Sequence, residues 1–163
     1  MDQIYNLRIP QAGVIIPEGA NNNYINFGNY SNLSVISTLI GTSFSGQNIT
    51  LHAGTYKIDI SMDCSFTGSN STGVLVSDKH LYIVDAVIED VNGNLLTDLK
   101  TASCISNFWG TSIQRYGFSF ILKLESSQTI RVNLKNESGG TSNARKDASH
   151  TGLSIMFKRV FNG

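Results

Sequence analysis

The side chains that could perform acid–base or metal chemistry are few and widely separated along the chain. Its three histidines, His52, His80 and His150, stand at no metal-ligand spacing to a cysteine or to one another. The most compact charged group, Asp78-Lys79-His80, comes just before a predicted strand and is typical of a surface turn. A Ser-His-Asp site could assemble from distant residues, but a chain this rich in serine offers no pattern for one. We therefore predict no metal site.

A pair of carboxylates could act as general acid and base. Asp59 and Asp63 lie on the same side of a predicted strand, where four residues of extended chain put them roughly 13 Å apart. Carboxyl pairs in glycoside hydrolases are closer than that. The chain also lacks the G-x-S-x-G, Walker A and G-x-G-x-x-G patterns. The sequence thus predicts no enzyme and no cofactor.

Two other residue types leave alternatives open. Cys64 and Cys104 could form one disulfide, but two free thiols are the favoured interpretation, because Cys64 belongs to an apolar row. Trp109, the single tryptophan, lies in Asn107-Phe108-Trp109-Gly110 between predicted strands. It could stack on a sugar ring as a ligand contact, or it could plug the end of a sandwich.

Composition limits the remaining classes of function. The chain has 163 residues, enough for one domain with a sizeable core, and 12 basic residues balance 12 acidic ones. Zero net charge argues against nucleic-acid binding, which normally needs a basic stripe. No apolar run approaches the roughly 18 residues that span a bilayer, and the first residues lack the pattern of a signal peptide. We expect neither nucleic acid nor a membrane as a partner.

Polar and apolar residues alternate along most of the chain, which is typical of half-buried strands. The alternation is cleanest where apolar residues from Tyr56 to Phe66 take turns with Lys57, Asp59, Ser61 and Asp63. Further alternating strands are predicted at 118–124, 130–135 and 153–158, with a turn at 125–128.

A different pattern covers Leu81 to Val91, where both faces are largely apolar. Asn92-Gly93-Asn94 then predicts a hairpin turn, and Leu95, Leu96 and Leu99 a return strand. With short strands at 33–40 and 49–51, the pattern predicts an all-β antiparallel sandwich or barrel.

The first 28 residues differ from the rest. Pro10 and Pro17 interrupt the segment, yet its apolar content is too high for a solvated tail. Two interpretations stay open: a first strand with a wrapped arm of the same domain, or an arm that anchors the protein to a partner. We take 1–28 as the N-terminal arm and 29–163 as the domain.

Three stretches of the chain show a resemblance to a known superfamily. Ala53-Gly54-Thr55-Tyr56, the segment from Tyr116 to Leu124 with Ile130-Arg131-Val132, and the closing Gly152 to Phe157 resemble core strands of the tumour necrosis factor and complement globular-head superfamily. The resemblance spans roughly residues 30 to 161. It implies a jelly-roll sandwich that forms a homotrimer, binds partners and performs no catalysis. Where that superfamily usually has Gly-Asp in a turn, this chain has Ser127-Gln128.

The resemblance also implies that the outward side chains of three neighbouring strands face the trimer axis. Here that face would pair Asp59 and Asp63 with Lys123 and Lys158, each exposed pair contributing about 0.2–1 kcal/mol. Either the face is wet and no trimer of this kind forms, or it is a polar interface. We favour the interface, with apolar contacts from Tyr116, Ile121, Met156, Tyr82, Val84 and Ile88.

These observations predict a structural protein of a virus particle, a bacteriophage capsid-decoration, head-fibre or tail-tip component. Its expected location is the virion, with a secreted or cell-surface protein as the alternative. Other virion proteins would bind through residues 1–28. The alternative function is a carbohydrate- or receptor-binding module that recognises a cell-surface glycan.

Overall fold

A computed structural model describes residues 3–9, 15–16, 23–67, 80–106, 111–136, 139–140 and 148–160. For 15–16, 64–67, 80–82, 103–106, 111–114, 136, 139–140 and 148–151 it describes the backbone only. In these ranges the elements are β1 (Ile4–Ile9), β2 (Ile15–Ile16), η1 (Phe27–Asn29), β3 (Ser34–Ser37), β4 (Ser43–Ser45), β5 (Asn48–Leu51), β6 (Gly54–Thr67), β7 (His80–Asp90), β8 (Lys100–Ser106), β9 (Thr111–Leu124), β10 (Gln128–Asn136), β11 (Gly139–Gly140) and β12 (Ala148–Val160).

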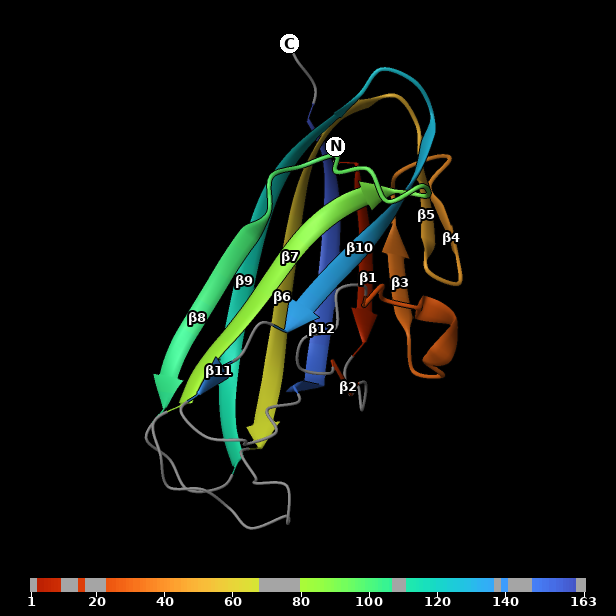
Figure 1. Cartoon of the computed structure of the whole chain (residues 1–163). Helices are drawn as coiled ribbons and strands as arrows, with labels where there is room; N and C mark the ends of the chain where they lie inside the picture. The colour runs from red at the N-terminus through yellow and green to blue at the C-terminus, as the bar shows by residue number, and fades with distance from the viewer. Residues whose placement is uncertain are drawn as a thin grey trace.

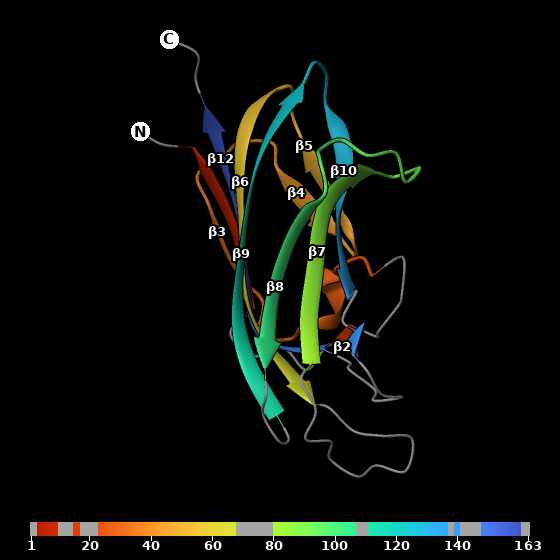
Figure 2. The same ribbon diagram turned by 60° about the vertical axis from the view of Figure 1, so that its left-hand side comes forward.

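These strands form two antiparallel sheets that pack face to face (Figures 1 and 2). Sheet A has the order β3-β1-β12-β6-β9, with β2 paired to β12. Sheet B has the order β11-β7-β10-β5-β4, with β8 paired to β7. The predicted all-β jelly-roll sandwich is therefore confirmed.

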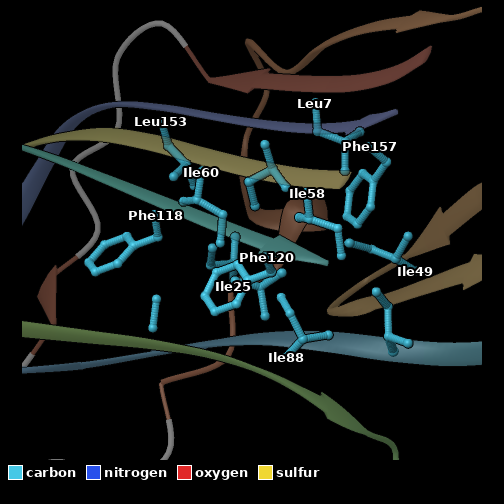
Figure 3. Close-up of a cluster of buried hydrophobic side chains, with 14 of the residues drawn as sticks. Leu7, Ile25, Ile49, Ile58, Ile60, Ile88, Phe118, Phe120, Leu153 and Phe157 are labelled. Carbon is cyan, nitrogen blue, oxygen red and sulfur yellow. The ribbon is translucent and has the colours of Figure 1, made fainter. Parts of the chain in front are cut away.

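The core between the sheets follows directly from the alternation in the sequence. Along β6, Tyr56, Ile58, Ile60 and Met62 are almost fully buried because every second side chain of a strand points to the same face. The facing side chains of β7 and β10 are equally buried, and Figure 3 shows the resulting cluster filling the space between the layers.

Residues near the N-terminus belong to this sandwich. β1 lies between β3 and β12, and its side chains Tyr5, Leu7 and Ile9 are buried in the core. Farther along, the Ile25 amide donates to the carbonyl oxygen of Val132 at 3.1 Å. For the described part of residues 1–28 the structure thus has a first strand of the same domain, and the sandwich begins before residue 29.

The strand with two apolar faces, β7, is covered on both sides. Val84, Ala86 and Ile88 belong to the core, whereas Val87 is fully buried on the opposite face. The hairpin turn after it is confirmed, with Gly93 at φ +85°, but the return strand was predicted too early. Residues 95–99 form an irregular segment bridged to β7 at one residue, and β8 begins at Lys100.

Candidate interaction surfaces

The outer face of sheet A, which points away from the core, is the surface that the sequence singled out. The pairing register places its side chains in rows across the strands. One row runs Ile36, Asn6, Met156, Asp59 and Ser119 from β3 to β9. The next row runs Ile4, Lys158, Lys57 and Ile121.

Two charged pairs near this face join residues that are two apart along the chain. Asp59 lies 3.1 Å from the Lys57 ammonium and also accepts a hydrogen bond from the Ser119 hydroxyl. Lys123 pairs with Glu125 at 2.7 Å, both of them exposed. Lys123 is opposite Thr55, and Lys158 is opposite Lys57. In the register, neither lysine is directly opposite an acid on β6.

Asp63 has an arginine as its partner. The Arg115 side chain on β9 donates from Nε at 2.7 Å and from Nη2 at 3.4 Å to the two carboxylate oxygens. This contact holds the pKa of the Asp63 carboxyl below its ordinary value of 3.8. Sequence reasoning missed Arg115, although its place opposite Asp63 follows once the strands are in register.

The predicted apolar contacts of the trimer divide into two groups. Tyr116 shares a face with Phe118 and Phe120 and is buried in the core. Its predicted place on the outer face was therefore wrong, because neighbouring residues of a strand point to opposite faces. Val84 and Ile88 are also core residues and offer no surface. Ile121, 65% exposed, and the half-buried Met156 do lie on the outer face. The side chains of Tyr82 and of Trp109 lie outside the described residues.

An open groove of about 670 Å³ lies at one edge of the sandwich. One wall is the segment 95–100, and the other is Ser119–Ile121 of β9, the edge strand of sheet A. Leu95, Leu99 and Ile121 are 62%, 43% and 65% exposed there. We call this the edge groove. The sequence had assigned these leucines to a strand, so only the structure reveals the groove.

The outer face of sheet B holds a buried polar network. Glu89, on β7, accepts hydrogen bonds from the Tyr24 hydroxyl at 2.7 Å and from the Asn133 side-chain amide at 3.0 Å. The Arg131 guanidinium stacks 5.2 Å from the centre of the Tyr24 ring. Glu89 is 4% exposed and Asn133 fully buried, so this network fastens residues 23–25 to sheet B.

Catalytic geometry is absent from the described part of the chain. His52, between β5 and β6, has its Nδ1 2.8 Å from the hydroxyl of Ser127 in the β9–β10 turn. Both side chains are exposed, and His52 has no carboxylate partner among the described residues. No three His, Cys, Asp or Glu side chains in the described ranges could hold a metal ion. The described residues also include no helix long and apolar enough to cross a membrane.

Solved structures provide the comparison for the fold. PRD1 vertex protein P5 is similar over 98% of this chain and 97% of its own, with a TM-score of 0.50 and 15% identity. A chain from the structure of infectious bursal disease virus Gx strain has a TM-score of 0.49 and 11% identity. That match covers 99% of this chain and 33% of the viral chain. The globular domain of zebrafish complement 1qA protein gives 0.48 at 6% identity, covering 99% and 98%.

Sequence comparison adds nothing further, since neither protein-family models nor curated proteins match the chain. The similarity to PRD1 vertex protein P5 agrees with the expected jelly-roll sandwich, and it concerns the fold alone.

Proposed function

We propose that the protein is a non-enzymatic structural component of a virus particle that assembles as a homotrimer. The similarity to PRD1 vertex protein P5 over nearly the whole of both chains carries this proposal. A vertex is the corner of a polyhedral shell, so that name describes a structural position. The described residues form a sandwich with an apolar core, and they include no group of side chains that could hold a metal ion, which supports the same role.

The trimer is proposed to use the outer face of sheet A. This face has few large apolar groups, and its acids are paired within the same copy by Lys57 and Arg115. Because these acids are already paired, contact with another copy would not bury them as unpaired charges.

Attachment to the particle is proposed to involve residues 1–28, apart from the apolar side chains of β1. Tyr5, Leu7 and Ile9 already pack in the core and are not available to a partner. The bacteriophage origin and the choice among capsid decoration, head fibre and tail tip stay predictions from sequence.

Two measurements test the proposal. Light scattering at micromolar concentration should give a mass three times that of the 17.7 kDa chain, and a monomer would contradict the trimer. Gold-labelled antibody against the purified chain should mark intact particles of the source virus. Particles that contain none of the chain would contradict the structural role.

A further inference from the structure

The outer edge of β3 is a strand edge with which no other strand of the described chain pairs. β3 is one of the two edge strands of sheet A, and β9 is the other (Figure 1). All four residues of β3 are exposed, and its two apolar side chains, Val35 and Ile36, are 44% and 61% exposed. An exposed edge with apolar side chains is a template for pairing with a further strand.

The hydrogen bonds between β1 and β3 show which backbone groups of β3 point outward. The Thr38 amide donates to the carbonyl oxygen of Ile4 at 2.8 Å. Hydrogen-bonded and non-hydrogen-bonded residues alternate along an antiparallel pair, so Ile36, two residues earlier, also directs its amide and carbonyl toward β1. Val35 and Ser37 therefore turn their N–H and C=O groups toward the open edge.

These outward groups are complementary to a second copy of themselves. When two β3 strands run antiparallel with Ile36 opposite Ile36, Val35 of each copy lies opposite Ser37 of the other. Each Val35–Ser37 pair can exchange two N–H···O=C bonds, because both residues belong to the outward set. The two Ile36 side chains meet on the outer face at the two-fold axis and lose contact with water.

Charge does not guard this edge. Native edge strands are commonly protected by lysine or another charged residue, yet residues 19–56 contain no Asp, Glu, Lys or Arg. The opposite edge strand of the sheet, β9, does carry Arg115 and Lys123. Beside β3, Arg8 lies opposite Ser34, two residues from Ile36 along the strand. The antiparallel contact therefore brings no like charges together at the Ile36 pair.

We infer that β3 pairs edge to edge with β3 of a second copy of this chain, about a two-fold axis at Ile36. The contact uses the same surface on both copies, so each edge accepts one partner only. It goes beyond the proposed homotrimer, because it joins copies that belong to different trimers. Two strands of four residues bury little area, so we expect the contact at high protein concentration.

Cysteine cross-linking tests the register. Residues of a non-hydrogen-bonded pair have Cα atoms about 4.5 Å apart, a distance that a disulfide spans. We expect Ile36→Cys to give covalent dimers, and no larger product, on a non-reducing gel after mild oxidation. Ser34→Cys is the matched control on the same exposed strand, because the two copies of residue 34 would be offset by four residues, roughly 13 Å. The wild type, with Cys64 and Cys104, shows the background.

Equal cross-linking of Ile36→Cys and Ser34→Cys would overturn the inferred register. No cross-linking of Ile36→Cys above the wild-type background would overturn the contact itself.

Light scattering at rising concentration tests the backbone pairing. Ser37→Pro removes one outward N–H from each copy, and proline is tolerated on an edge strand where its missing N–H faces water. Ile36→Lys brings two like charges to the axis. We expect the wild-type mass to rise above its dilute value as the chain approaches about 1 mM. Both variants, with Tm values close to that of the wild type, should keep the dilute mass.

The same measurement separates this contact from the proposed trimer. The dilute mass reports the trimer, and one chain there would contradict the trimer alone. No rise in the wild type, or the same rise in the wild type and both variants, would overturn the β3 contact and leave the trimer unaffected.

Discussion

Gly41 is a residue at which a side chain would be strained. Its φ is +75°, and a Cβ there would lie 1.8 Å from Nε2 of His52. We expect Gly41→Ala to lower the free energy of unfolding by at least about 1 kcal/mol, because the residue would be strained and would displace the ring. Urea denaturation measures this. In a His52→Ala background the loss should shrink, whereas Gly117→Ala, with only an ordinary contact at 4.0 Å, is the control.

Tyr24 links stability to alkaline pH. The pKa of its phenol is raised, first by the hydrogen bond to Glu89, then by burial and by the negative charge of that carboxylate. Because the phenol pKa is higher in the folded state, the Tyr24–Glu89 hydrogen bond contributes its full stabilisation of the fold below pH 10. That stabilisation is lost as the pH rises through the raised pKa. Tyr24→Phe should cost about 1–3 kcal/mol at neutral pH, because it removes a donor from buried Glu89.

The pH profile distinguishes this account from a general loss of packing. Tm measured between pH 8 and pH 12 should fall less steeply for Tyr24→Phe than for the wild type. Tyr5, Tyr30 and Tyr56, whose pKa values burial raises, keep part of the slope in both proteins. Parallel profiles would contradict the role of the Tyr24–Glu89 contact.

At the scale of the element, two neighbours on β6 show how a strand divides its side chains between core and water. Ile58 is fully buried and Lys57 has a half-exposed side chain. We expect Ile58→Ala to cost about 2–5 kcal/mol of unfolding free energy, because it leaves a cavity in the core. Lys57→Ala should change that value by no more than about 0.5 kcal/mol. Equal losses from the two variants in chemical denaturation would contradict this orientation of β6.

The alternation of polar and apolar residues predicts the strands and their buried faces well, but it does not determine which strands pair or in which register. The strand from Tyr56 onward was predicted with its buried side correct, since period two is a local signal. Ion pairs such as Asp63–Arg115 depend on register between distant segments, which one sequence does not reveal. Tyr116 was misplaced by one residue, which is enough to move a side chain to the opposite face.

At the scale of the whole molecule, β1 decides whether sheet A is complete. It shields one side of β12 and contributes Tyr5, Leu7 and Ile9 to the core. We expect deletion of residues 1–9 to lower Tm strongly and to promote aggregation, because it bares an edge of β12 and removes buried apolar groups. Deletion of residues 1–2 is the control, because the Gln3 carbonyl oxygen accepts a hydrogen bond from the Arg159 amide. A Tm unchanged by the longer deletion would contradict the role of β1.

The sandwich as a whole could be predicted because polar and apolar residues alternate independently in several segments. Its exposed surface features, such as the edge groove, could not be predicted from that alternation. From the two apolar faces of Leu81–Val91, Val84 and Ile88 were predicted to contact a second copy, whereas the chain itself already buries both of them. Leu95 and Leu99 line a groove instead of a strand because the chain leaves its extended form for several residues before β8.

The central position of β12 in sheet A has a consequence for biosynthesis. β12 separates β1 from β6, yet its residues are the last of the sheet to leave the ribosome. Until then the nascent chain carries two unjoined halves of that layer, each with unpaired backbone groups and uncovered apolar rows. Folding of the sandwich is therefore completed only after β12 has been synthesised, and the growing polypeptide is a natural client for chaperones that bind extended segments.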